Sequence, residues 1–191
     1  MGKKEERRSA SILVCMIMVS VCSMAANPIG GHDLFSATGL DKILKTESFG
    51  IVRGSHFGMS MKAILELEED NLGNISNPGE LVFHLGDKES SYKPAWHKPA
   101  IVSYSFENEE LYKICLNIYE SNLLAKAKMD KALVDHFNAI YGQNILTNDG
   151  SLVWVGKDFI SGKEFRISLK NLDDVKNLGI TMMFELAEAA R

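Results

Sequence analysis

The stretch from Ala100 to Tyr119 constrains the fold most, because apolar and polar residues alternate in it twice. The first alternation ends at Phe106 and the second begins at Tyr112, with the polar residues 107–110 between them. Alternation with a period of two places successive side chains on opposite faces of a β-strand. Two such runs joined by a short polar segment predict a β-hairpin with one buried face and one solvated face.

Other periodic segments extend this hairpin into a predicted α+β domain of two units. In each unit we expect one helix and three strands, with both helices packed on an antiparallel sheet. The first unit (49–119) has a helix over 60–70, capped by Ser60, and strands over 81–85, 100–107 and 111–119. The second unit (120–191) has a helix over 128–141 and strands over 151–156, 164–169 and 179–186. The side chains expected in or beside the core are Trp154, Phe165, Ile167, Met182 and Phe184.

The first 25 residues have the pattern of a secretory signal peptide. Four basic residues precede Ser9, and an uncharged run then extends to Ala26 with small residues at Ser23 and Ala25. A basic start, an apolar centre and a small-x-small exit predict cleavage after Ala25 or Ala26, and export to the periplasm or the medium. The alternative is an uncleaved membrane anchor, although the run is a little shorter than the roughly 20 apolar residues of a spanning helix.

The remaining composition limits the function classes. Removal of residues 1–25 would leave 166 residues, enough for one domain. We expect a flexible lead with a marginal helix over 26–48 and a single domain over 49–191. A short strand is expected over 49–53, at the start of this domain. This chain would carry 17 Lys and Arg against 23 Asp and Glu, a net charge of −6. Such a balance disfavours nucleic acid, whose binding depends on phosphate neutralisation by basic residues. Cys115 would be the one remaining cysteine, so no internal disulfide is expected.

The segment Phe57-Gly-Met-Ser-Met-Lys-Ala-Ile resembles a family pattern. It is similar to the G-M-[ST]-x-x-x-[VI] turn into a helix of small exported domains of the SmpA/OmlA (BamE-like) and β-lactamase-inhibitor-protein type. In those domains a helix pair packs on an antiparallel sheet, and the inhibitor protein repeats this unit in tandem. The resemblance covers the element order from about Phe49 to Leu186, although a clear second helix is missing from each unit. It implies a binding protein of the cell envelope rather than an enzyme.

Signals for catalysis, metals and cofactors are weak. The histidines show no ligand spacing such as H-x-x-x-H, and the chain has no G-x-S-x-G nucleophile turn. We therefore expect no catalytic residue, no metal and no cofactor. One alternative is a hydrolase-like enzyme with a dispersed site drawn from His56, His84, His97 and acidic neighbours. Another is a carrier of a small ligand, which would have an apolar cavity between helix and sheet.

The segment Ser91–Ala100 has the composition of a recognition loop. Two prolines bracket Trp96 and His97, and Tyr92 lies just before them. A stiff loop with aromatic side chains loses little entropy on binding. We predict that Tyr92, Trp96 and His97, together with the sheet face, bind another envelope or extracellular protein, with membrane contact only through an uncleaved or lipidated N-terminal segment. Alternatively, Trp96 folds back and plugs the end of the sheet.

Overall fold

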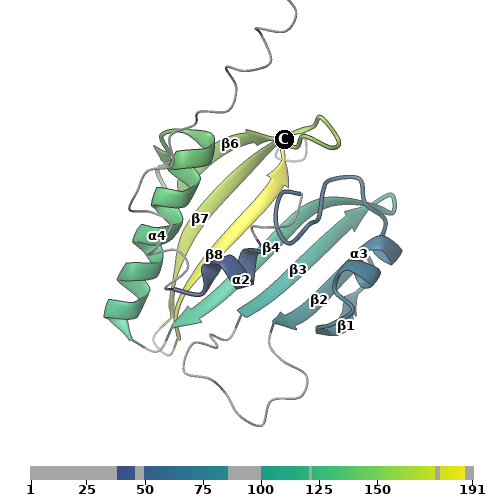
Figure 1. The fold of residues 1–191 in the computed structure, drawn as a ribbon, viewed down its shortest axis with the longest axis horizontal. Coiled ribbons are helices and arrows are strands. Elements are labelled where there is room, and N and C mark those ends of the chain that lie inside the picture. The colour runs from purple at the N-terminus through teal and green to yellow at the C-terminus, as the bar shows by residue number, and fades with distance from the viewer. Residues whose placement is uncertain (1–37, 46–49, 86–99, 121, 175–176, 188–191) are drawn as a thin grey trace, which may run out of the picture.

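The computed structural model describes residues 38–45, 50–85, 100–120, 122–174 and 177–187 of the chain. This part is an antiparallel sheet with helices packed on one face, which confirms the α+β class (Figure 1). Its helices are α2 (Leu40–Leu44), α3 (Met61–Leu67) and α4 (Leu123–Tyr141). Its strands are β1 (Leu72–Asn77), β2 (Glu80–Leu85), β3 (Ala100–Glu107), β4 (Glu110–Glu120), β5 (Ile145–Leu146), β6 (Leu152–Lys157), β7 (Glu164–Asp174) and β8 (Asn177–Leu186).

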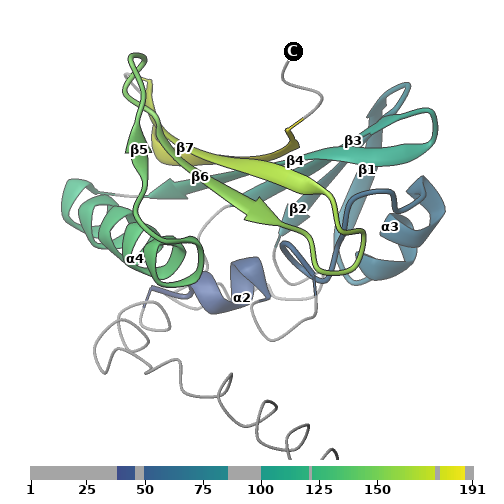
Figure 2. The same ribbon diagram turned by 90° about the horizontal axis from the view of Figure 1, so that it is seen from above.

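The eight strands form one sheet in the order β1-β2-β3-β4-β8-β7-β6-β5. Every neighbouring pair is antiparallel, including the predicted neighbours β2, β3 and β4. The strands of the first half and those of the second half meet where β4 pairs with β8. Figure 2 shows α2, α3 and α4 on the same side of the sheet.

The number of strands per half differs from the prediction. Four strands, rather than three, follow each of α3 and α4. The added strand β1 reads Leu-Gly-Asn-Ile-Ser-Asn, a composition typical of turns, and its pairing with β2 overrides that preference. The added strand β5 has two residues. The predicted pair of units with one helix and three strands is therefore not confirmed, and the sheet dominates the fold.

The predicted hairpin is formed by β3 and β4, with one change of register. Ser105 pairs with Lys113, whereas Phe106 pairs with Leu111. Tyr112 is the extra residue of this β-bulge, and a bulge moves the residues beyond it to the other face. Leu111 is consequently fully buried and Tyr112 is half-buried. The expectation that the buried alternation begins at Tyr112 is wrong for this reason.

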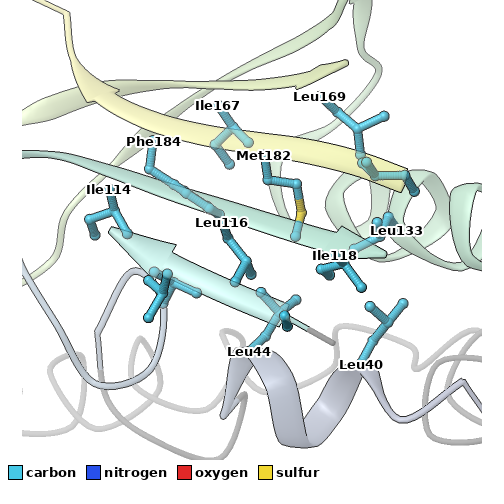
Figure 3. Close-up of a cluster of buried hydrophobic side chains, with 14 of the residues drawn as sticks. Leu40, Leu44, Ile114, Leu116, Ile118, Leu133, Ile167, Leu169, Met182 and Phe184 are labelled. Atoms are coloured by element: carbon cyan, nitrogen blue, oxygen red, sulfur yellow. The ribbon is translucent and has the colours of Figure 1, made fainter. Parts of the chain in front are cut away.

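One hydrophobic core lies between the helices and the sheet (Figure 3). All five predicted core side chains of the second half are buried in it: Trp154, Phe165, Ile167, Met182 and Phe184. Leu40 and Leu44 of α2 are buried in the same core, and Figure 3 shows both pointing toward the sheet. The packed domain therefore includes α2, and the boundary expected at residue 49 lies too late in the chain.

Side-chain caps set the starts of the two longer helices. Ser60 caps α3 as predicted, because its hydroxyl accepts a hydrogen bond from the N–H of Ala63 (3.3 Å). Asn122 caps α4 in the same way through the N–H of Ala125 (2.9 Å), so this helix begins at residue 123 rather than 128. α3 ends at Leu67 rather than at residue 70.

Two further findings concern the N-terminal half of the chain. The short strand expected over 49–53 is not present over 50–53, where an isolated bridge joins Val52 to Ser55. None of the helices in the described ranges is long and apolar enough to cross a bilayer. The predicted signal sequence lies outside these ranges.

Candidate functional site

The face of the sheet opposite the helices is the first candidate site, and we call it the open face. No helix of the described part covers it (Figure 2). Its side chains alternate along the strands with those of the core, and the strand register aligns them in cross-strand rows. We name the three rows at the middle of the sheet the central, charged and polar rows. A fourth row, beyond the polar row, consists of Tyr119, Gly179 and Leu172.

The central row crosses six strands and contains no charged residue. Its members, in sheet order, are Val82, Ser103, Cys115, Met183, Ser168 and Val153. Val153 is buried and the other five are half-buried. The row is about 24 Å long, because five steps of about 4.8 Å separate its end strands.

The rows on either side are polar. The charged row alternates in sign across the middle of the sheet and contains Glu80, Ser105, Lys113, Glu185, Arg166 and Val155. The polar row contains His84, Ile101, Asn117, Thr181 and Lys170. Within it, the Thr181 hydroxyl donates to the side-chain carbonyl of Asn117 (2.7 Å). The uncharged central row thus has a polar or charged row on each side.

Cys115 lies at the middle of the central row. It is a free cysteine, and burial raises the pKa of its thiol. A raised pKa keeps the thiol protonated at neutral pH and makes it a poor nucleophile. The side chain therefore acts as a small, weakly polar surface element rather than as a reactive group.

A hollow of about 230 Å³ lies on the open face over β7 and β8, where the β5–β6 turn approaches them. It contains Asp149, whose carboxylate is 3.5 Å from the ammonium of Lys170. Hydrogen bonds from Thr147 and Ser151, with a smaller effect of Lys170, lower the pKa of Asp149. These hydroxyls shape the turn between the strands, and exposed ion pairs contribute little stability. We read this group as turn structure at the rim.

A second candidate lies on the helix side of the sheet, and we call it the helix-side cavity. It has a volume of about 410 Å³ and lies between the end of α2, residues 50–53, the C-terminal half of α4 and residues 157–160 of the β6–β7 turn. Phe137, Phe165 and Phe184 form part of its lining. An apolar cavity between helix and sheet is the feature that the sequence analysis assigned to a small-ligand carrier.

A buried charged cluster borders this cavity. The guanidinium of Arg53 donates to both carboxylate oxygens of Glu68 (2.6 and 2.7 Å) and to the carbonyl of Ile43 (2.7 Å). The Tyr104 hydroxyl donates to one oxygen of Glu68, and the Asn71 amide donates to the other (2.7 Å). Burial, reinforced by the charge of Glu68, raises the pKa of Tyr104 well above its usual range. Each Glu68 oxygen has two donors, so the cluster joins α3, β3 and the 50–55 turn and leaves no group for catalysis.

The family-like motif has a structural role in the described fold. Gly58 donates its N–H to the carbonyl of Leu111 (2.9 Å), and the N–H of Leu111 donates to the carbonyl of Met59 (2.9 Å). Gly58 has φ = +88°, which a residue with a side chain rarely adopts. The N–H of Phe57 donates to the buried carboxylate of Asp158 (3.1 Å) and so joins this motif to the second half.

The histidines proposed for a dispersed catalytic site do not converge where the structure describes them. His84 pairs with Ile101 near the start of β3, whereas His56 lies beside the turn that contacts Leu111 at the other end of the hairpin. Five residues of strand separate these levels, about 17 Å. His97 lies outside the described residues. Among those described, no group of three or more His, Cys, Asp or Glu side chains could hold a metal ion.

The predicted binding residues Tyr92, Trp96 and His97 also lie outside the described ranges. The segment that carries them joins Leu85 of β2 to Ala100 of β3, which pair directly. Sequence reasoning named the sheet face and, as an alternative, an apolar cavity between helix and sheet, but it did not identify the residues of either candidate site. The alternation placed Ser103 and Cys115 on a solvated face, but their alignment with Met183 depends on the pairing of β4 with β8. The residues of the cavity left no local signal, since its lining comes from six separate segments: 44–45, 50–53, 136–141, 157–160, Phe165 and Phe184.

No protein-family model, no curated protein and no solved structure matches this chain. The resemblance of the Phe57–Ile64 segment to the SmpA/OmlA and β-lactamase-inhibitor-protein type therefore remains a prediction.

Proposed function

We propose that this protein is a non-enzymatic binding protein that holds another protein against the open face of its sheet. The observation that carries the proposal is the uncharged central row on a face without a covering helix in the described part. Sheet faces that meet only water carry mostly polar side chains in alternation with the core. Protein interfaces, in contrast, have centres depleted in charge and rims that are polar. The central, charged and polar rows of the open face have this distribution.

The size and charge of the open face fit a protein partner. In a standard protein interface each partner contributes a patch of about 800 Å², which is roughly 28 Å across. The central row, at about 24 Å, is nearly as long as such a patch is wide. Lys113, Glu185 and Arg166 alternate in sign along the charged row, which fixes register against a partner rather than attracting a polyanion. The excess of 25 acidic over 21 basic residues in the full chain also disfavours nucleic acid.

The location and the tandem organisation belong to the same proposal. The basic and apolar start of the chain supports export to the periplasm or the medium. We infer that the two halves are tandem units of one helix with its strands, since α3 precedes β1–β4 and α4 precedes β5–β8. Both halves contribute strands to the open face. Tyr92, Trp96 and His97 would add contacts from the connection between β2 and β3.

Site-specific cross-linking tests the proposed binding face. A photoreactive amino acid at Ser103, in the central row, should capture a defined protein in intact cells, and the same group at the exposed Lys128 of α4 should not. With the photoreactive group placed instead at Met183 of the same row, Ser103→Arg introduces a long cation into the centre of the interface and should reduce capture at least tenfold, because an unpaired buried charge is costly. Ser105→Arg, two residues along the same strand in the charged row, is the matched control and should have a smaller effect.

The outcome depends on where capture occurs. Equal capture from Ser103 and Lys128, or unchanged capture by the Ser103→Arg variant, would refute binding through the open face. The same variants should keep their thermal unfolding midpoint within a few degrees, because substitutions away from the core usually change stability by about 0.5 kcal/mol or less.

N-terminal sequencing of the mature protein tests export separately: a start at Ala26 or Asn27 is expected.

A further inference from the structure

We propose that the helix-side cavity binds a small molecule with an apolar body and one acidic group, such as a medium-chain carboxylic acid. Its volume of about 410 Å³ lies within the roughly 300–1,000 Å³ of small-molecule sites. Its walls come from two helices, one loop and the β6–β7 turn, and it is distinct from the open face on the opposite side of the sheet.

The floor of the cavity is aromatic and held in place by ring contacts. Phe137 of α4 packs edge-on against Phe184 of β8, with ring centroids 6.0 Å apart. Tyr141 packs edge-on against Phe165 of β7 at 5.9 Å. Gly156 permits this approach, because a Cβ there would lie 2.7 Å from the Phe165 ring and 2.8 Å from the Tyr141 ring. A rigid apolar floor binds an aliphatic or aromatic body by removing its surface from water.

Exposed hydrophobic side chains gather at the same place. Phe159 is 98% exposed, and Ile140 and Ile160 are each 54% exposed; all three line the cavity. Single exposed apolar residues are common, but a group of them around one cavity marks a ligand or interaction site. This exposure is independent of the cavity volume and indicates an apolar occupant.

The charged groups of the lining indicate the polar end of the ligand. Arg53 is used by Glu68 and by the carbonyl of Ile43. The Asp158 carboxylate accepts hydrogen bonds from two backbone N–H groups and from the Ser161 hydroxyl, so it is also satisfied. Lys45 remains, and among the described residues it forms no ion pair within 4 Å with an acidic side chain. Lys157 also borders the cavity, but it lies on the open-face side of β6 with Val155, opposite Glu164 of β7. The unpaired charge of the lining is therefore positive, which complements one carboxylate.

Three probes with the same ten-carbon chain separate these contributions: decanoate, decan-1-ol and decylammonium. We expect calorimetric titration of the full-length protein to give a single site for decanoate with a Kd on the order of 10–100 μM, a usual value for about 12 non-hydrogen atoms. Decanol should bind several-fold more weakly and decylammonium at least tenfold more weakly. The absence of saturable decanoate binding at millimolar concentration would overturn the proposal, and equal affinity for all three probes would overturn the acidic group.

Matched variants locate the site. Ile140→Asp introduces a carboxylate at the cavity and should weaken decanoate binding at least tenfold, whereas Leu146→Asp, at a similarly exposed position (69%) outside the lining, should change it less than twofold. Lys45→Glu should abolish the preference for decanoate over decanol, and Lys128→Glu should preserve it. Equal effects within either pair of variants would place the binding elsewhere and refute the assignment.

The two proposed sites can fail independently. Ser103→Arg should leave decanoate affinity unchanged, because it lies on the other face of the sheet. Decanoate binding that depends on Ser103 and not on Ile140 would assign the ligand to the open face and overturn the cavity site.

Discussion

The two faces of the sheet differ in kind although the same strands supply both. On β4, Leu116 is fully buried beneath the helices, while its neighbour Cys115 is half-buried on the open face. On the helix side the buried side chains of Arg53 and Glu68 have their hydrogen bonds satisfied within the fold. On the open face the central row has no covering helix in the described part. The helix side thus carries the core and the satisfied buried ion pair, and the contrast is the basis for the proposal that the open face binds a partner.

The largest expected effect is at the buried cluster on the helix side. Glu68→Gln should lower the free energy of unfolding by about 3–5 kcal/mol, because it leaves the Arg53 charge buried without its counter-ion. Glu66→Gln on the same helix is the control: Glu66 is 69% exposed and lies 3.8 Å from Lys62, so the loss should be within about 0.5 kcal/mol. Urea unfolding of both variants measures the difference. Similar losses in both would show that the buried cluster does not stabilise the helix side.

The next effect compares adjacent residues of one strand. Leu116→Ala removes a fully buried side chain and should cost about 2–5 kcal/mol. Cys115→Ala, on the open face, should cost less than about 1 kcal/mol and should instead weaken partner capture. Thermal unfolding and the cross-linking assay, applied to both variants, give the two measurements. A Cys115 variant as unstable as the Leu116 variant would show that something other than solvent covers the open face.

A moderate effect is expected at Gly156, where the helix side is most tightly packed. Gly156→Ala should lower the free energy of unfolding by about 1–3 kcal/mol, because the added Cβ would overlap the rings of Phe165 and Tyr141. It should also change decanoate binding, since both rings lie at the cavity. Calorimetry on the variant measures both quantities. Combination with Tyr141→Ala, which removes one of the two rings, should cost less than the sum of the single losses.

Local alternation predicted much of the sheet but not the details that make its faces. The β3–β4 hairpin and its pairing with β2 followed from period-two patterns, and the buried side chains of β6, β7 and β8 followed in the same way. β1 was missed because its Gly and Asn residues are typical of turns, and tertiary pairing overrides that preference. Leu111 is buried in the core where the alternation predicted Tyr112, because a bulge shifts the register at this point, and alternation alone does not predict a bulge.

The candidate sites were less accessible to sequence reasoning than the fold. The central row aligns Cys115 with Met183 and Ser168, which are far away in the sequence and meet through the pairing of β4, β8 and β7. The role of α2 was missed as well, because a five-residue apolar pattern carries little signal without its packing partners. The predicted loop residues Tyr92, Trp96 and His97 stay a prediction.

The smallest effect concerns the thiol at the centre of the open face. Burial raises the pKa of Cys115, so folded protein retains this proton at pH values where the unfolded chain has lost it. The free energy of unfolding should therefore be highest below the unfolded thiol pKa, near 8.5, and should decrease slightly as the pH rises through the folded value. Because the thiolate is the nucleophile, iodoacetamide should alkylate Cys115 more slowly in folded than in urea-denatured protein at pH 8.

Mass spectrometry of the peptide that contains Cys115 measures this rate without interference from Cys15 and Cys22. In folded protein the rate should increase with pH well beyond 8.5, since each unit of pH below the raised pKa raises the thiolate fraction about tenfold. Protein cross-linked to its partner through Ser103 should react more slowly still, because the partner would cover the central row. Alkylation of the folded protein as fast as that of the denatured chain would mean that the open face is a fully solvated surface, and the difference between the two faces would then not extend to a binding role.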